Sequence, residues 1–406
     1  MNGQQQPRGR LWVTILFGGG AILLAASIVK SPGAAFDASL QGLTLWWRIV
    51  FPGLLPFLVI SQILVAYGLV HVLGTLLDPL LRKGFGVPGV AGWVIPLGLI
   101  AGFPSAAEAS AQLYAQGRLS ARQAGMLASA AHFCSPMLII VVIGTGFLHN
   151  PALGLLLAAV HSVTGLAAGM TLHVILSRRD KKRLNPPPLT SDQDRHHSRS
   201  LLQSIEEARQ ADGRSFGKLL GDTVASSVQT LMMIGGYMLI FAVAARMIQL
   251  YIPGLGSPLG LAGILEVHLG SYAAANAEFS SPSLQAALLG AILGFSGLSS
   301  YLQVRAVLGP AGIGTGLFLL TRMLHAIYAF GLTLLCWKPL SSLFPGAAPV
   351  YKEAAPAAAS ADSLNNILEW PYILSMVKWQ IVILALFTAS LLVFTLIWRF
   401  RGRAAR

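Results

Sequence analysis

The stretch that decides the fold is "GVAGWVIPLGLIAGFPSAAE", residues 89 to 108. Its apolar part is typical of a helix in a membrane or a protein core, but that run ends at Gly102 and Pro104. A new helix is predicted to start at Ser105. Each apolar arm around this turn has only about 12 residues, fewer than the roughly 20 that cross a bilayer core. A helix break at membrane depth is tolerated where it is buried in protein or faces a water-filled cavity. The stretch therefore predicts a re-entrant helical hairpin.

The composition places this hairpin in a membrane. The 406-residue chain is 54% hydrophobic and 11% charged, and its mean hydropathy is +0.66. Several apolar stretches have the length of a membrane-spanning helix. We expect an all-α polytopic membrane protein with one helical bundle and no separate soluble domain. Cys134 and Cys336 both lie in apolar segments, which argues against a disulfide framework.

Hydropathy and helix breakers predict full-length apolar segments and two interrupted regions. The first segment follows a basic N-terminus, but its apolar run exceeds that of a signal peptide and no cleavage site follows, so we expect a membrane helix. The segments are 11–29, 45–66, 122–148, 151–176, 224–249, 314–337 and 378–398, and the interrupted regions are 90–117 and 284–308.

A basic stretch, residues 178 to 218, divides the chain. It contains ten Lys or Arg residues and a triple proline, which predicts an exposed linker on the cytoplasmic side. Membrane topology and anionic headgroups explain these charges, so we expect no nucleic-acid binding. The predicted organisation is an N-terminal membrane helix and loop (1–44), a first repeat (45–177), the linker (178–218) and a second repeat (219–406).

The second interrupted region contains a counterpart of the first. "GLSSYLQ", residues 297 to 303, aligns with "GFPSAAE", residues 102 to 108, and pairs Gly102 with Gly297. Both contain Ser-x-x-Glu/Gln, a pattern that predicts a capping box at the start of a helix. Glu108 then either only caps this helix or also belongs to a substrate site.

A histidine follows each of these tips on a downstream helix, His132 in the first half and His325 in the second. The chain is therefore predicted to form two inverted repeats, each with a re-entrant helical hairpin and a broken transmembrane helix. In secondary transporters such repeats hold the substrate between broken helices near the bilayer midplane.

Arg322 is the most unusual charged residue in an apolar segment. It lies about eight residues into segment 314–337, roughly 12 Å from the helix start, where an arginine is costly and usually paired or functional. One interpretation is a structural partner for Glu266 or Glu278. The other is a counter-charge for an anionic substrate, with His325 on the same helix face.

Other polar residues in apolar segments allow more than one interpretation. "HFCSPM", residues 132 to 137, predicts a second break in which Ser135 caps a helix that starts at Pro136. His161 and His173 are expected to be packed or interfacial. "LEVHLG", residues 265 to 270, lies either near the pore or in a surface loop.

The candidate site combines the tips, the second break and the Arg322 helix. No catalytic or metal-binding motif is present, so the sequence predicts no enzyme activity, no metal and no cofactor. A transporter and a non-transporting scaffold both stay open, as do proton coupling through Glu108 or the histidines and passive flux. The candidate substrate-binding residues are Gly102, Pro104, Ser105, Glu108, His132, Ser135, Gly297, Ser299, Ser300, Gln303, Arg322 and His325.

Five stretches together resemble the sporulation integral membrane protein YlbJ family, whose nucleoside-recognition, or Gate, domains are similar to parts of concentrative nucleoside transporters. The resemblance covers roughly residues 40 to 400. The stretches are "WWRIVFPGLLPFLVISQIL" (46–64), "GLIAGFPSAAE" (98–108), "HFCSPMLII" (132–140), "SSVQTLMMIGGYMLIF" (226–241) and "LEVHLG" (265–270).

The resemblance implies transport of the dianion dipicolinate across the outer forespore membrane during sporulation. Glu108 and Ser135 depart from the family pattern, which more often has Lys and Asn there, and a carboxylate at the tip would repel a dianion. A nucleoside-like solute is the alternative substrate.

We expect contact with the lipid bilayer, and a homo-oligomer stays open. An even number of crossings before the linker lets the N-terminus and the linker both lie in the cytoplasm. Seven full crossings then put the C-terminus outside, although four arginines near the C-terminus favour the cytoplasm.

Overall fold

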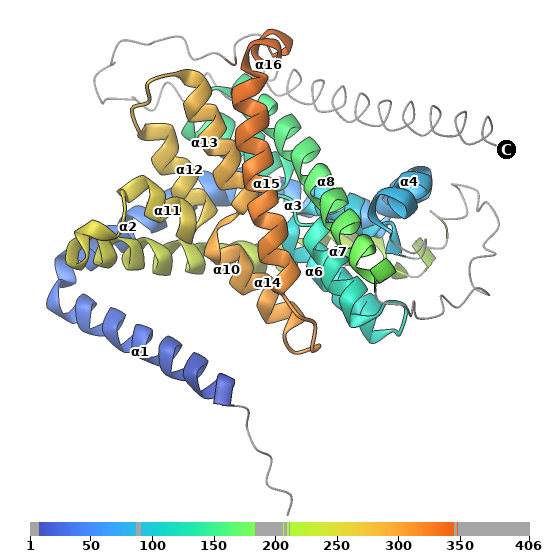
Figure 1. Ribbon diagram of the computed structural model, residues 1–406, viewed down its shortest axis with the longest axis horizontal. Coiled ribbons are helices and arrows are strands. Elements are labelled where there is room, and N and C mark those ends of the chain that lie inside the picture. Colours follow the sequence, from blue (N-terminus) through green and yellow to red (C-terminus); the bar gives the residue numbers. More distant parts are fainter. Residues whose placement is uncertain are drawn as a thin grey trace, which may run out of the picture.

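The computed structural model describes residues 8–86, 91–182, 206, 209–210, 212–344 and 347. All regular elements in these ranges are helices (Figure 1), so the all-α prediction is confirmed there. The predicted segment 378–398 and most of the linker lie outside the described residues.

The helices of the first half run from the N-terminus to the long helix that enters the linker. Helix α8 extends to Lys182, past the predicted start of the linker. The elements are α1 (Arg8–Lys30), α2 (Pro32–Leu45), η1 (Trp46–Val50), α3 (Phe51–Ala66), α4 (Leu69–Phe85), α5 (Val94–Ala101), α6 (Phe103–Ala115), α7 (Ala121–Ala130), η3 (Leu138–Phe147) and α8 (Pro151–Lys182).

The second half begins with a long helix, α10, and ends in the described region with a short one. Several of its elements are short helices separated by single extended or left-handed residues. The elements are α10 (Phe216–Tyr251), η4 (Pro253–Leu255), α11 (Pro258–Leu265), α12 (Val267–Asn276), α13 (Pro282–Phe295), α14 (Gly297–Leu308), α15 (Gly316–Leu335) and α16 (Trp337–Leu343).

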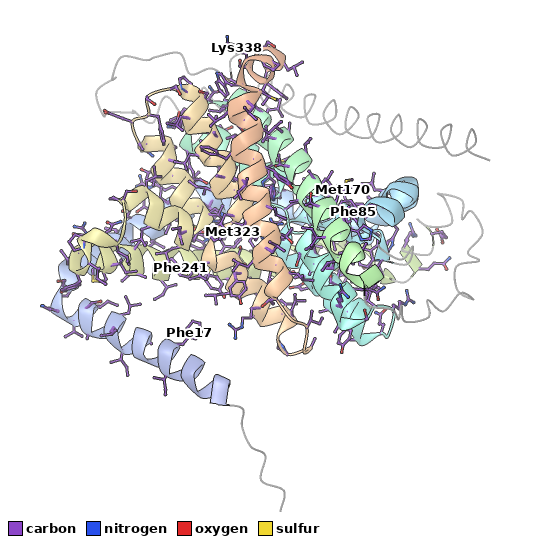
Figure 2. The ribbon with its side chains drawn as sticks, viewed as in Figure 1. Phe17, Phe85, Met170, Phe241, Met323 and Lys338 are labelled. Carbon is purple, nitrogen blue, oxygen red and sulfur yellow. The ribbon has the colours of Figure 1, made fainter. Side chains whose placement is uncertain are left out.

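Five stretches among the described residues are long and apolar enough to cross a membrane. Large apolar side chains also lie exposed on the outer faces of these helices, as Met323 does on α15 (Figure 2). Lipid around the bundle would cover such side chains at no cost. The five stretches are Pro32–Ala66, Pro151–Ser177, Phe216–Tyr251, Pro282–Leu308 and Gly316–Leu335.

Several helices start with the same local chemistry, a polar cap followed by proline. Asn150 Oδ1 accepts the Leu153 amide at 2.9 Å before α8, and Ser281 Oγ accepts the Leu284 amide at 3.3 Å before α13. In both cases the next residue is proline, whose missing N–H is not needed in the first helical turn. These caps fix where the helices begin.

Both interrupted regions contain a helix break, as predicted. Gly102 separates α5 from α6 with φ 89° and ψ −179°, a conformation essentially restricted to glycine. Ser296 separates α13 from α14 in the left-handed region, with φ 66°. The stretch Pro282–Leu308 is thus long enough to span a membrane but is interrupted inside.

The predicted capping boxes at these breaks are wrong. Helix α6 begins at Phe103 and α14 at Gly297, so Ser105 and Ser300 lie inside the first turn and do not cap it. Ser300 Oγ instead donates to the Gly297 carbonyl at 3.0 Å. Each helix starts directly after the residue with positive φ, Gly102 or Ser296, and not at Ser105 or Ser300. A complete capping box is found at Ser120 and Gln123, before α7.

The sequence analysis missed one broken pair, α11 and α12, which is interrupted at the extended residue Glu266. With this pair included, the element order is similar in the two halves. In each half a long helical stretch precedes two broken pairs and a further long helix, and in the first half α4 lies between that stretch and the broken pairs. In this order the breaks at Gly102 and Glu266 each lie in the first broken pair of their half, whereas the sequence alignment of the two tips pairs Gly102 with Gly297.

The packing between the halves is reciprocal. Helix α6, the second helix of the first broken pair in the first half, packs on α14 of the second half. Helix α12, the second helix of the first broken pair in the second half, packs on η3 of the first half. The two long helices α8 and α15 pack against each other between them, and α15 runs through the middle of Figure 1. The sequence analysis also missed α2 and the amphipathic α4.

Candidate functional site

A cavity of about 640 Å³ lies between α3, α6 and α10. Its volume falls within the range of small-molecule sites, roughly 300–1,000 Å³. Apolar residues of α3 and α5 form one part of the wall. The polar and charged lining residues are Gln62, Ser105, Glu108, Gln112, Ser135, Asp212, Arg214, Thr223, Ser226, Gln229, Thr230 and His268.

The structure divides the predicted site residues into two groups. Five of them line the cavity: Gly102, Pro104, Ser105, Glu108 and Ser135. The others are buried away from it: His132, Gly297, Ser299, Ser300, Gln303, Arg322 and His325. Ser105 and Ser300, which the sequence analysis expected in one cavity, are therefore separated by the packed wall.

Two helices start at the inner wall of the cavity. The N-terminus of α6 carries no side-chain cap. Its second residue, Pro104, has no N–H, so the first-turn amides with the capacity to bind an anion are those of Phe103 and Ser105. Ser135 Oγ accepts the Leu138 amide at 3.3 Å, which confirms the prediction that Ser135 caps the helix after the second break. The positive ends of both helix dipoles therefore lie at the cavity.

Arg322 lies behind this wall and is only 1% exposed. Its guanidinium donates to the main-chain carbonyls of His132 at 2.8 Å and Ser129 at 3.1 Å, and to that of Gly294 at 3.4 Å. These carbonyls lie at or just beyond the C-terminal ends of α7 and α13, where unpaired carbonyls and the negative end of the helix dipole gather. The guanidinium also lies 3.2 Å from His325 Nδ1 on the same helix. Among the described residues its hydrogen-bond partners are thus helix-end carbonyls and this histidine, and not Glu266 or Glu278.

The loop after α7 is held by both long helices. The Cys134 amide donates to His161 Nε2 on α8 at 3.0 Å, and His325 Nε2 on α15 donates to the His161 carbonyl at 2.9 Å. Cys134 Sγ also lies 3.9 Å from Ser296 Oγ at the other break. His161 is therefore packed, as predicted, and the breaks of the two halves meet here.

Glu266 and His268, left undecided by the sequence analysis, are both buried. Glu266 Oε2 accepts the Leu269 amide at 2.8 Å and caps α12, while Glu266 Oε1 lies 2.6 Å from His268 Nδ1. His268 lines the cavity, and its Nε2 atom has no hydrogen-bond partner among the described residues. The surface-loop interpretation is therefore wrong.

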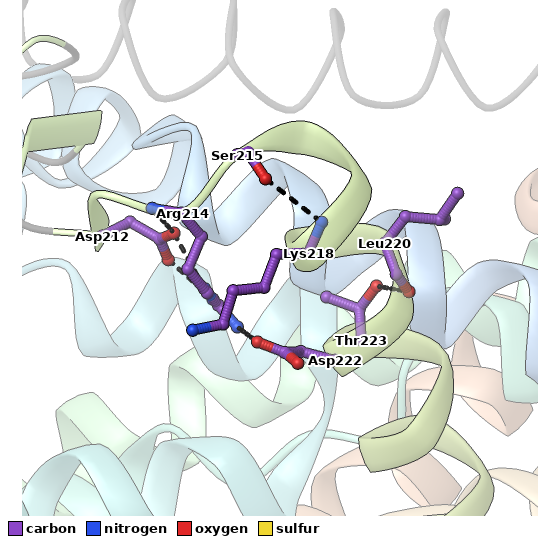
Figure 3. A network of polar contacts seen from close by, with 7 residues as sticks. All are labelled: Asp212, Arg214, Ser215, Lys218, Leu220, Asp222 and Thr223. Carbon is purple, nitrogen blue, oxygen red and sulfur yellow. Dashed lines mark hydrogen bonds and ion pairs between the residues drawn. The ribbon is translucent and has the colours of Figure 1, made fainter.

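Charged residues that precede α10, Asp212 and Arg214, also line the cavity, and Figure 3 shows their polar contacts. Arg214 pairs with Asp212 at 2.6 Å and with Asp222 of α10 at 3.1 Å. The hydrogen bonds from Arg214 hold the pKa of the Asp212 carboxyl below its usual range. This network ties the end of the linker to the first turns of α10.

The sequence analysis missed the contribution of α10. Thr223, Ser226 and Thr230 follow one another at intervals of three and four residues, the spacing of a single helix face, and all three line the cavity. A polar stripe at this period on an apolar helix was the available signal. Gln62 on α3 also lines the cavity and donates to Ser227 Oγ at 3.2 Å.

The comparisons with known proteins agree with this architecture. Residues 47–148 match the Gate family model, described as nucleoside recognition. This range contains both the α5–α6 break and the loop held by Arg322. The sporulation integral membrane protein YlbJ of Bacillus subtilis (strain 168) is 35% identical over 348 residues, which cover 80% of this chain and 83% of the relative. No solved structure matches the chain.

The fold and the site define a class: integral membrane proteins with a Gate domain, whose broken helices border a polar cavity. The chain belongs to the YlbJ family of sporulation integral membrane proteins, and the resemblance expected from its motifs is confirmed.

Proposed function

We propose that the protein is a membrane transporter that carries a small anionic solute, an aromatic dicarboxylate such as dipicolinate, through the cavity between α3, α6 and α10. The single observation that carries this proposal is the uncapped N-terminus of α6 at the cavity wall. Free amides at a helix start are an anion-binding arrangement, and a second helix start, at Ser135, lies on the same wall.

The rest of the lining is suited to a flat, hydrogen-bonding anion. Apolar side chains of α3 and α5 offer a surface for an aromatic ring, and Ser226 of α10 offers a hydroxyl that can donate to a carboxylate oxygen. The hydroxyls of Thr223 and Thr230 donate to main-chain carbonyls of α10. Glu108 is the exception, because an ionised carboxylate at the tip repels the solute. Arg322 is proposed to act indirectly, by holding the loop that presents Ser135 to the cavity.

We further propose that the two halves are inverted repeats and that the broken pairs are re-entrant hairpins. The similar element order and the reciprocal packing of α6 on α14 and α12 on η3 support this. In such transporters alternating access comes from rocking of one repeat against the other around a fixed site. The relative's name places it in sporulation, which supports the outer forespore membrane as the location.

A nucleoside-like solute is the second candidate. The Gate match is described as nucleoside recognition, and three glutamine side chains, Gln62, Gln112 and Gln229, line the cavity. Amide side chains pair well with the donors and acceptors of a nucleobase. This candidate predicts a neutral solute, whose uptake does not depend on charge in the lining.

Uptake into proteoliposomes tests both candidates and the scaffold alternative. Purified protein should accumulate labelled dipicolinate faster than empty liposomes do, and excess unlabelled isophthalate, which has the same carboxylate spacing, should compete. Excess uridine should not. Competition by uridine alone would support the nucleoside candidate, and uptake no faster than that of empty liposomes for either solute would leave only a scaffold.

A further inference from the structure

The charge of the cavity lining poses a problem that the proposed function does not solve. Among the described residues, its formally charged members are the carboxylates Glu108 and Asp212 and the guanidinium of Arg214. Arg214 is already engaged by Asp212 and Asp222. With neutral His268 the lining therefore carries one net negative charge, and a dianion that enters it needs a compensating positive charge.

His268 is placed to supply that charge. Its side chain lies at the cavity beside the two helix starts, on the second residue of α12. It is 3% exposed, and its Nε2 atom is buried without a hydrogen-bond partner in the part of the chain that the structure describes. An unpartnered buried nitrogen is costly unless something else occupies it at another stage of the cycle.

The contact with Glu266 decides what Nε2 can do. An ionised carboxylate only accepts hydrogen bonds, and its negative charge is favoured at the N-terminus of α12. The 2.6 Å contact therefore places a proton on His268 Nδ1. The neutral ring then presents a lone pair at Nε2, which repels a carboxylate. After Nε2 takes a proton it presents an N–H donor, which attracts one.

Other titratable groups near this pair are few in the described structure. Cys134, on the loop after α7, is close enough to interact with the Glu266 charge. Glu108 of α6 lines the cavity, as do Asp212 and Arg214. No titratable residue occurs in η3, α11 or α13, which also pack against α12. The other two helices that pack against it do carry such residues: Lys218, Asp222, Tyr237, Arg246 and Tyr251 on α10, and Tyr301 and Arg305 on α14. Glu108 is thus the rival carrier of a proton in this cavity.

We propose that Glu266 and His268 form a proton-binding pair, in which Nε2 of His268 takes up one proton when an anion binds in the cavity and releases it when the anion leaves. The proton comes from water on the side of entry and returns to water on the side of exit. Because binding linkage is reciprocal, a proton gradient then drives the anion. This inference rests on the proposed function and adds its coupling ion.

The first experiment measures accumulation by the wild-type protein in proteoliposomes, with the membrane potential clamped at zero. One proton carried with each dipicolinate predicts about tenfold accumulation for one pH unit, acidic outside. Dipicolinate that enters but only reaches equal concentrations would overturn the coupling and leave the proposed function intact. No dipicolinate uptake under either condition would overturn the proposed function itself.

Variants then locate the proton. His268→Gln keeps a hydrogen-bonding side chain but cannot take up a proton in this range, so residual uptake should no longer respond to the gradient. In Glu266→Gln the side-chain carbonyl oxygen can still cap α12, while the side-chain amide donates to His268 Nδ1. The ring proton then stays on Nε2, which is a permanent donor. Uptake by this variant should therefore also lose its response to the pH gradient. Glu108→Gln should retain the response. Loss in Glu108→Gln with retention in His268→Gln would overturn the assignment.

A binding measurement covers the case in which a variant does not fold. Calorimetric titration of the detergent-solubilised wild-type protein with dipicolinate, in buffers of different ionisation enthalpy, gives the number of protons taken up per anion. We expect a value close to one at neutral pH. A value of zero would overturn the proposal without reference to any variant.

Discussion

Arg322 on α15 donates a 2.8 Å hydrogen bond to the main-chain carbonyl of His132, which lies 190 residues earlier in the chain. The same guanidinium also contacts the Ser129 carbonyl, so one side chain from the second half closes the end of α7 in the first. This contact explains how an arginine can be buried among apolar helices without a carboxylate. It also fixes the position of the loop that carries Ser135.

The first prediction concerns this arginine. Arg322→Gln removes the charge and leaves buried carbonyls without donors, so the free energy of unfolding should fall by at least about 3 kcal/mol. The free energy of unfolding of Arg322→Lys should fall less, since lysine keeps the charge but cannot reach several carbonyls at once. Thermal unfolding in detergent measures both, and Arg246→Gln on the exposed face of α10 is the matched control.

The same variants separate two roles of Arg322. If the guanidinium only holds the loop, dipicolinate uptake should fall together with the unfolding temperature. An Arg322→Gln protein that unfolds at the wild-type temperature but does not transport would instead indicate direct contact between this residue and the solute.

The second prediction concerns the break at Gly102. Gly102→Ala places a Cβ on a residue with φ 89°, which costs about 1–3 kcal/mol in this region. The added Cβ would lie 3.7 Å from Ser135 Cβ, so strain and not a clash is the cause. We expect lower thermal stability and slower uptake as the α6 N-terminus shifts. Gly236→Ala on α10, where a Cβ meets nothing within 4 Å, should be neutral, and equal behaviour of the two variants would refute this account.

The breaks were predictable from sequence only where the local residues encode them. Gly102 and Pro104 predict an interruption because glycine adopts positive φ and proline starts helices. Whether the helix starts at Phe103 or Ser105 depends on the backbone angles of Gly102, which the Ser-x-x-Glu pattern does not report. The break at Glu266 has neither glycine nor proline in its place, and it was missed for that reason.

The candidate site was predicted in part for a similar reason. Residues near the first tip, such as Ser105, line the cavity because they lie next to the break that faces it. The sequence correctly identified Arg322 as an unusual charge in an apolar segment. Its distant partners could not be predicted, because main-chain carbonyls such as that of His132 leave no trace in the pattern of side chains. His268 acquires its position only when α12 packs against the first half, through η3.

The third prediction concerns the charge of the cavity lining. Arg214→Glu should slow dipicolinate uptake several-fold at low ionic strength, because it replaces a positive charge in the cavity lining by a negative one, which repels an anion. The effect should shrink as salt screens the charge. Stability should change by no more than about 1 kcal/mol, since the ion pair is partly exposed. Initial uptake rates at two salt concentrations measure this.

Arg305→Glu is the control for that experiment, because Arg305 is exposed on α14 and does not line the cavity. It makes the same change in net charge at another place. If Arg305→Glu slowed uptake as much as Arg214→Glu, the effect would belong to the overall charge of the protein and not to the charge of the cavity lining.

The central claim is that the solute passes through the cavity beside the α6 N-terminus, and cysteine protection tests it most directly. In a Cys336→Ser background with native Cys134 buried, Ser105→Cys lies at the cavity and Ser300→Cys behind its wall, where Ser300 is 0% exposed. An anionic thiol reagent should modify Ser105→Cys and block dipicolinate uptake. Dipicolinate should protect this cysteine against modification and preserve uptake. The cysteine in Ser300→Cys should not react. Full modification of Ser105→Cys with uptake unchanged, or equal reaction at both positions, would contradict the account.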